Sequence, residues 1–150
     1  MITLIDSIEI KTAPEHVYNW LISLKTGKDY RAWHPGHVDW IWIQGEPFQI
    51  GSVVYSEEYL HGEIHKLKFV CTNIIPNRLV EYKPLFPWSI IMLSSSFAIE
   101  SKSEDDSIFT ATLNFRSFPL IDKVLKNQLE GTRLHMKEEG ENLKKILEGK

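Results

Sequence analysis

The stretch PLIDKVLKNQLEGTRLHMKEEGENLKKILE, residues 119–148, carries the pattern that decides the fold of this 150-residue chain. It has no proline after its first residue, and its apolar side chains recur with a helical period over many turns. We therefore expect one long helix over residues 119–148. One stripe of this helix carries Ile121, Leu125, Gln128, Thr132, His135, Glu139, Leu143 and Ile146. The opposite stripe is rich in lysine, so the first stripe should face the interior.

The middle of the chain has the pattern of six strands joined by turns. Short runs rich in β-branched and aromatic residues alternate with turn signals such as His61-Gly62 and Pro76-Asn77. The expected strands cover residues 38–44, 52–60, 63–75, 78–83, 89–102 and 107–115.

The N-terminal segment adds one strand and two short helices. Residues 2–10 fit a half-buried strand, and Thr12 followed by Pro14 predicts a helix with Thr12 as its N-cap. A second short helix should hold Tyr30 and Trp33 before the next proline ends it. We therefore predict one α+β domain over residues 1–150, with a seven-stranded antiparallel sheet, two short helices after the first strand and a long C-terminal helix.

Composition excludes several classes of protein. Hydrophobic residues make up 43% and charged residues 25% of the chain, as in ordinary globular domains. A net charge of -3 argues against nucleic acid as a partner, and no apolar run approaches the roughly 20 residues that span a bilayer. Cys71 is the only cysteine and the first residues do not resemble a signal peptide, so we expect a cytoplasmic location. The oligomeric state is left open.

His135 and Glu139 are the polar residues on the inward stripe that could carry chemistry. Their i, i+4 spacing places both side chains over one patch of the helix, where they could hold one metal ion. A buried carboxylate is costly unless it is paired, protonated or coordinated. A hydrogen-bonded His-Glu pair and a metal site are therefore the two interpretations.

A second group of candidate ligands precedes and enters the sheet. His34 and His37 flank the Pro35-Gly36 turn, so either imidazole could reach the mouth of the sheet. Glu57 and Glu58 follow in an otherwise apolar strand. The metal ligands would then be His34 or His37, Glu58 or Glu57, His135 and Glu139.

The register of one hairpin favours Glu58 over Glu57. If His61-Gly62 is a two-residue turn, Glu58 pairs with His65 and both point to the same face as Leu67, Phe69 and Cys71. Glu57 would then point to water. A three-residue turn would reverse this assignment.

Two histidines and two carboxylates suit a divalent ion such as zinc, iron or manganese, with one position left for water. Trp40 and Trp42 share one face of a strand, and with Phe69 they are candidates for binding a hydrophobic small molecule. Core packing is an equally good interpretation of both tryptophans.

The chain resembles the START-like or Bet v 1-like superfamily, also called SRPBCC or polyketide cyclase-like, over nearly its whole length. Three segments carry the resemblance. They are residues 8–18, with Ile8-Glu9-Ile10 and Ala13-Pro14-Glu15-His16-Val17-Tyr18, residues 76–82, Pro76-Asn77-Arg78-Leu79-Val80-Glu81-Tyr82, and residues 141–144, Glu141-Asn142-Leu143-Lys144. The resemblance implies a helix-grip fold, in which a curved sheet closes around the C-terminal helix and a ligand cavity. It leaves function open.

The order His, Glu, then His-x-x-x-Glu is similar to that of phloretin hydrolase and diacetylphloroglucinol hydrolase. These zinc-dependent enzymes of the same fold cleave a carbon–carbon bond beside an aromatic ketone. The resemblance implies a metal-dependent hydrolase or lyase. We expect Glu58 and His65 to be catalytic residues, with His65, or whichever of His34 and His37 is not a ligand, moving a proton.

Two other functions are compatible with the sequence. The chain could be a carrier or sensor that binds an apolar ligand without chemistry, with the His and Glu residues as an internal polar network. It could also be a metal-free cyclase or isomerase with Glu139 as a general base of raised pKa. In a metal-free site we expect the two carboxylates to repel one another, one of them to take up a proton, and Glu139→Gln to stabilise the protein.

Overall fold

Seven antiparallel strands form one sheet in the order β1-β7-β6-β5-β4-β3-β2. The computed structural model describes residues 1–149, and the side chains of Ile121 and Val124 lie outside that description. The strands are β1 (Ile2–Ile10), β2 (His37–Gln44), β3 (Val53–Leu60), β4 (Glu63–Ile75), β5 (Leu79–Pro84), β6 (Met92–Ser103) and β7 (Asp106–Phe115). The predicted seven-stranded antiparallel sheet is confirmed.

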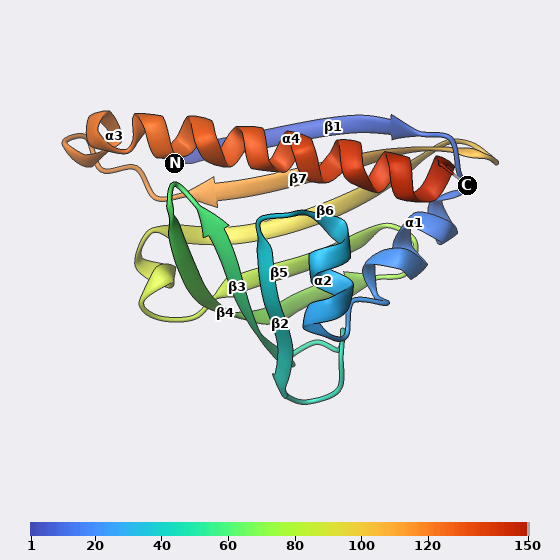
Figure 1. The fold of residues 1–150 in the computed structure, drawn as a ribbon, viewed down its shortest axis with the longest axis horizontal. Coiled ribbons are helices and arrows are strands. Elements are labelled where there is room, and N and C mark those ends of the chain that lie inside the picture. Colours follow the sequence, from blue (N-terminus) through green and yellow to red (C-terminus); the bar gives the residue numbers. More distant parts are fainter. Residues whose placement is uncertain (150) are drawn as a thin grey trace.

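The C-terminal helix runs beside β1 and β7 (Figure 1). It is divided, because α3 (Ile121–Val124) ends before α4 (Lys126–Glu148) begins. The carboxylate of Asp122 accepts hydrogen bonds from Ser117 Oγ at 2.7 Å and the Phe118 amide at 3.1 Å, which closes the turn that leads into α3. The prediction of one unbroken helix is therefore wrong at its first turn.

The predicted inward stripe of α4 is fully buried only in its second half. His135, Met136, Glu139, Gly140 and Leu143 are buried. Gln128 and Ile146, which the helical period placed inward, are exposed. Gln128 nevertheless lines an interior cavity together with Leu125 and Thr132, so the first half of the stripe also faces inward, and Ile146 near the end of the helix is the exception. The side chain of Ile121 lies outside the described residues.

The two short helices are α1 (Pro14–Leu21) and α2 (Gly27–Trp33). Thr12 does not cap α1 as predicted, because Ala13 occupies the N-cap and the Thr12 hydroxyl bonds to His16 Nδ1 at 3.0 Å. Helix α2 begins with a capping box between Thr26 and Asp29. Its C-terminal end leads directly into the turn that carries His34 and His37.

The start of β6 is the strand boundary that differs most from the prediction, and the other boundaries differ by at most one residue. Residues Trp88–Ile90 form a short 3-10 turn, η1, so β6 begins at Met92 rather than at Ser89. The Trp88 indole donates a hydrogen bond to the Lys66 carbonyl at 3.0 Å and fastens this turn to β4. The aromatic and β-branched residues of this run fit a strand equally well, which explains the error.

The β3–β4 register is the one expected for a two-residue turn. His61 and Gly62 have φ values of 56° and 76°, and Leu60 pairs with Glu63. Glu58 consequently lies opposite His65, as predicted. On its other side Glu58 is paired with His37 at the start of β2. The sheet thus places His37, Glu58 and His65 on three neighbouring strands.

The core lies between the sheet and the helices. Its fully buried members are Ile10, Val17, Leu21, Leu24, Val54, Cys71, Val80, Phe109 and Leu143. No helix within residues 1–149 combines the length and the apolar character needed to cross a membrane.

Candidate metal centre and adjoining cavity

Four side chains from three elements converge in the interior. The potential ligand atoms of His37 on β2, Glu58 on β3, and His135 and Glu139 on α4 all lie within 4.8 Å of one another. His37, His135 and Glu139 are buried and Glu58 is half-buried. Sequence reasoning named each of these residues, although it left the choice between His34 and His37 open.

The spacing of the ligand atoms suits one small cation. His37 Nε2 lies 2.8 Å from Glu139 Oε2 and 3.8 Å from Glu58 Oε1, and His135 Nε2 lies 3.3 Å from Glu139 Oε2. Two ligand atoms bound to one tetrahedral zinc ion stand about 3.4 Å apart. The three distances bracket that value.

Hydrogen bonds distinguish His37 from His34. His37 Nδ1 lies 2.9 Å from the Tyr30 carbonyl oxygen, which assigns it as a donor, and Nε2 points into the cluster, 2.8 Å from Glu139 Oε2. A cation bound at the cluster would replace this contact. In His34 the assignment is reversed, because Nδ1 accepts the Gly36 N–H at 2.8 Å and Nε2 donates to Glu138 Oε1 at 3.0 Å. His34 therefore has no lone pair directed at the centre, although its ring lies beside those of His37 and His135.

The ionisation states of Glu139 and His135 depend on one another. Burial would raise the pKa of Glu139, but the positive charge of His135 and the hydrogen bond from His37 hold this pKa well below its usual value. Burial would lower the pKa of His135, but the carboxylate of Glu139 raises it to about 9. The pair is thus an imidazolium and a carboxylate at neutral pH.

This ion pair corrects two expectations. Glu139 does not have the raised pKa of a buried general base, because the imidazolium of His135 compensates its charge. For the same reason, repulsion between carboxylates does not place the proton on Glu139 in the metal-free protein. His135 takes up that proton instead.

His135 Nε2 is a buried polar atom without a hydrogen-bond partner. Its 3.3 Å contact with Glu139 is an ion pair that is not aligned as a hydrogen bond. Buried polar atoms are nearly always paired, so an orphaned one needs an explanation. A cation that displaces the proton of Nε2 would satisfy this atom, and the two imidazoles and two carboxylates are ligands that zinc accepts. The residues present therefore fit a divalent metal ion.

Tyr30 is a further part of the site that sequence reasoning treated only as a residue of a short helix. Its hydroxyl donates a hydrogen bond to Glu58 Oε1, and its ring stacks on His37 with centroids 3.7 Å apart and planes 5° apart. Burial and the charge of Glu58 raise its pKa, so Tyr30 stays protonated as a donor. Its position seven residues before His37 is the only sequence signal of this role.

Helix α2 is tied to α4 next to the centre. The Trp33 indole donates to the Glu139 carbonyl at 3.0 Å, and the Asn142 side-chain amide donates to the Trp33 carbonyl at 3.0 Å. These bonds fix the depth of α4 over the sheet. They therefore fix where the Glu139 carboxylate meets His37.

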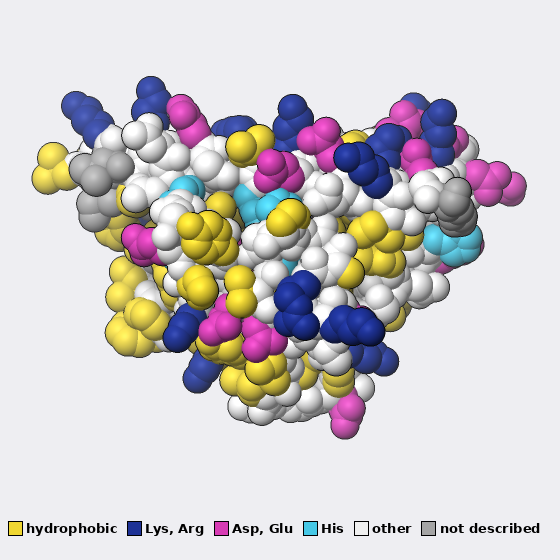
Figure 2. All heavy atoms as spheres, in the orientation of Figure 1, with side chains coloured by type: hydrophobic (Ala, Val, Ile, Leu, Met, Phe, Trp, Pro, Cys, Tyr) yellow, Lys and Arg dark blue, Asp and Glu magenta, His cyan; other side chains and the backbone are white. Residues whose placement is uncertain are grey.

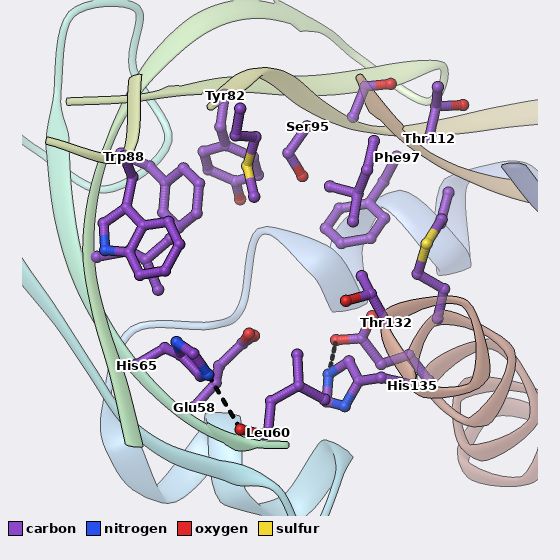
Figure 3. A pocket seen from close by; sticks show the side chains of 18 of the residues that line it. Glu58, Leu60, His65, Tyr82, Trp88, Ser95, Phe97, Thr112, Thr132 and His135 are labelled. Atoms are coloured by element: carbon purple, nitrogen blue, oxygen red, sulfur yellow. Dashed lines mark hydrogen bonds and ion pairs between the residues drawn. The ribbon is translucent and has the colours of Figure 1, made fainter. Parts of the chain in front are cut away.

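A cavity of about 350 Å³ adjoins the centre. Its walls are mostly apolar and aromatic, while Glu58, His65 and His135 lie along one side, across from Tyr82 and Ser95 (Figure 3). The Trp88 ring adjoins that of His65, with centroids 5.5 Å apart. The apolar and aromatic lining residues include Leu21, Leu24, Trp33, Trp40, Leu67, Phe69, Tyr82, Trp88, Phe97 and Leu113. A small apolar molecule would therefore lie with its edge at the His and Glu cluster.

The three predicted ligand-binding residues are not in equivalent places. Trp40 and Phe69 line the cavity. Trp42 is not among the lining residues, because its ring packs on Phe48 with centroids 4.7 Å apart and its indole donates to the Leu24 carbonyl at 3.0 Å. Trp42 belongs to the core instead.

His65 also lines the cavity but stands apart from the four ligands. Its Nε2 lies 3.0 Å from the Leu60 carbonyl oxygen, which assigns Nε2 as a donor and leaves Nδ1 as an acceptor. Glu57 points away from the centre, where Tyr55 donates a hydrogen bond to it at 2.8 Å. The register therefore selects Glu58 over Glu57.

The comparisons with known proteins bear on the fold. No protein-family model matches the sequence, and no curated protein matches it. Solved structures do match. The Aha1 dimer from Colwellia psychrerythraea is 22% identical with a TM-score of 0.61, and the match covers 99% of this chain and 97% of that one.

Two enzymes have similar structures. The aromatase/cyclase ZhuI from Streptomyces sp. R1128 is 14% identical with a TM-score of 0.68, over 97% of this chain and 95% of that one. Norcoclaurine synthase from Thalictrum flavum, in complex with dopamine and hydroxybenzaldehyde, is 12% identical with a TM-score of 0.74, over 99% and 88%. At these identities the likeness shows the fold, and the predicted helix-grip fold is confirmed.

Proposed function

On this helix-grip scaffold of the START-like, Bet v 1-like superfamily, we propose a metal-dependent hydrolase or lyase. Its substrate would be a small apolar carbonyl compound, with aromatic ketones as the first candidates, bound in the cavity. The observation that carries the proposal is the convergence of His37, Glu58, His135 and Glu139 beside that cavity. Such a substrate could bring its carbonyl to the His and Glu cluster while its body contacts apolar walls.

His37, Glu58, His135 and Glu139 would hold the ion, with zinc as the first candidate. When bound, a divalent ion of this kind polarises a carbonyl and lowers the pKa of a water molecule. Two imidazoles and two carboxylates leave room for a further ligand if the ion expands its coordination, or if one carboxylate is displaced. His37 is held in the binding orientation by the Tyr30 carbonyl, and Glu58 by the Tyr30 hydroxyl.

Other residues would handle protons and exclude water. The hydrogen bond of His65 to Leu60 uses Nε2, so Nδ1 could take up a proton from a molecule in the cavity, as a general base. Apolar side chains such as Leu67, Phe69 and Trp88 would keep bulk water from the reacting carbonyl. Glu58, which we expected to be a catalytic residue, would then act as a ligand of the metal ion next to the substrate.

A non-catalytic carrier or sensor of a hydrophobic small molecule is the second candidate. The apolar character of the cavity walls favours it. Similar folds support binding of small molecules in general, since one similar structure contains dopamine and hydroxybenzaldehyde and another is an aromatase/cyclase. In that case the His and Glu cluster would be an internal polar network without a metal.

Equilibrium binding of cobalt(II), which absorbs visible light, separates the two candidates. We expect wild-type protein to bind one ion with strong absorption bands of a low-coordinate site, and Glu58→Gln to weaken that binding. Glu57→Gln removes the same charge from the neighbouring residue on the outward face and should bind as the wild type does. Equal weakening by both variants, or no binding by the wild type, would favour the carrier.

A further inference from the structure

A second hollow lies outside the centre, on the other side of His135. It is formed by the turn after α2, the tip of the β3–β4 hairpin and the exposed flank of α4, and we call it the outer cleft. Its polar lining residues are His34, His61, His135 and Glu138. In Figure 2, histidine side chains reach the surface in the strip between α4 and the tops of β2 and β3.

The hairpin tip separates the outer cleft from the large cavity. Leu60, His61 and His135 line both hollows. His61 lies so close to α4 that a Cβ on Gly131 would come within 2.6 Å of its ring. His135 is therefore reached from two sides, an apolar side through the cavity and a polar side through the cleft.

Polar groups in the cleft form a path from solvent to the centre. The Glu138 side chain is 46% exposed and lies 3.0 Å from His34 Nε2, and the His34 side chain is 10% exposed. The His34 ring is next to that of His135, with centroids 4.2 Å apart. His135 Nε2, which has no hydrogen-bond partner, then contacts Glu139.

His34 positions Glu138. Since Nδ1 of His34 accepts the Gly36 N–H, its Nε2 carries the proton that it donates to Glu138. The imidazole thus holds a carboxylate over the cleft. A carboxylate fixed in this way attracts a hydrated cation and raises its local concentration.

The alternative route through the large cavity is unfavourable for an ion. Its walls are mostly aromatic and aliphatic side chains, and moving a divalent ion past them would require loss of hydration without replacement ligands. The cleft offers the Glu138 carboxylate at its rim and is lined by His135, a proposed ligand of the centre.

We propose that Glu138, held by His34, is a loading site through which a divalent cation reaches His135 and the buried centre. This inference rests on the proposed function, because it requires that the centre bind a metal. In this proposal Glu138 changes the rates of metal uptake and release. A group that only stabilises the path lowers the barrier for uptake and release equally and leaves the equilibrium affinity unchanged.

Stopped-flow uptake of cobalt(II) by metal-free protein tests the loading site. We expect Glu138→Gln to slow uptake about tenfold, the lower range of electrostatic steering, and to slow release into chelator by the same factor. Glu138→Lys should slow uptake further, and wild-type uptake should depend more steeply on salt than that of either variant. His34→Gln should fall between wild type and Glu138→Gln.

Glu141→Gln is the matched control. It removes a carboxylate from an exposed position of the same helix, on the flank that faces Asp6 of β1, and should leave both rates close to those of wild type. Equal uptake rates for the Glu138 and Glu141 variants would overturn the loading site. Faster release from Glu138→Gln would overturn it as well, since Glu138 would then be a ligand. Failure of wild type to bind cobalt at equilibrium would overturn the proposed function and the loading site together.

Discussion

Glu139 Oε2 lies 2.8 Å from Nε2 of His37, a residue 102 positions earlier in the chain. The contact joins the C-terminal helix to the first strand of the β2–β3 hairpin in the interior of the protein. His135 adds a positive charge on the other side of the same oxygen. This carboxylate is therefore the centre of the polar cluster, whether or not an ion is bound.

Replacing Glu139 should affect the metal-free protein in the direction opposite to that expected from sequence. Glu139→Gln leaves the charged His135 without its partner, and breaking a buried ion pair costs about 3 kcal/mol. We expect urea unfolding in the presence of chelator to show a loss of this size. Glu57→Gln, at a position outside the cluster, should change the free energy of unfolding little. A stabilised Glu139→Gln protein would show that carboxylate repulsion dominates.

The stability of the metal-free protein should fall in alkali. The pKa of His135 is raised from 6.5 to about 9, because Glu139 outweighs the effect of burial. Its contribution is thus complete below pH 6.5 and is lost as the pH rises through about 9. The Glu139 pKa is lowered, so its contribution is present above the usual carboxyl value and is lost in acid.

Thermal melting of chelated wild type and His135→Gln across this range checks the sign. The melting temperatures of the two proteins should differ most at pH values above the acid range in which Glu139 is protonated and below about 9. The difference should shrink above about pH 9. A difference that stayed constant through that pH would show that His135 is not charged in the folded protein.

Tyr30→Phe should weaken metal binding while leaving the fold intact. The variant keeps the ring that stacks on His37 but removes the hydroxyl that orients Glu58. Loss of such an outer hydrogen bond typically lowers metal affinity about 10- to 100-fold. Tyr55→Phe is the matched control, because its hydroxyl bonds to the outward Glu57. Equal affinities for the two variants would remove Tyr30 from the site.

Two tryptophans, Trp88 and Trp42, differ in whether they line the cavity. Trp88 lines it and Trp42 does not. Trp88→Leu should therefore lower the affinity for a simple aromatic ketone such as acetophenone by about 1 kcal/mol, a typical value for one aromatic contact. Trp42→Leu should leave the affinity unchanged in the same calorimetric titration. If Trp42→Leu had the larger effect, the cavity would not be the ligand site.

Much of the fold and site follows from local patterns in the sequence. The His61-Gly62 turn fixed the β3–β4 register and so put Glu58 opposite His65. The helical period placed His135 and Glu139 on one buried face. Both inferences succeed because a turn type and a helix period are set by neighbouring residues alone.

Other features depend on how distant elements dock. His34 and His37 flank one turn, and only the hydrogen bonds to Gly36 and Tyr30 distinguish their nitrogens. The role of Tyr30 depends on the angle at which α2 meets β2 and β3, which no local pattern specifies. Trp42 lies on the same face of β2 as Trp40, but its ring packs against Phe48 outside the cavity.

Elemental analysis of protein purified without an affinity tag tests the central claim most directly. The proposed centre predicts close to one equivalent of a transition metal per chain, zinc in the first instance, and its removal by chelator should lower the melting temperature of wild type but not that of Glu139→Gln. Protein without transition metal, whose melting curve chelator leaves unchanged and added zinc does not raise, would contradict the metal centre and leave the hydrophobic-ligand carrier.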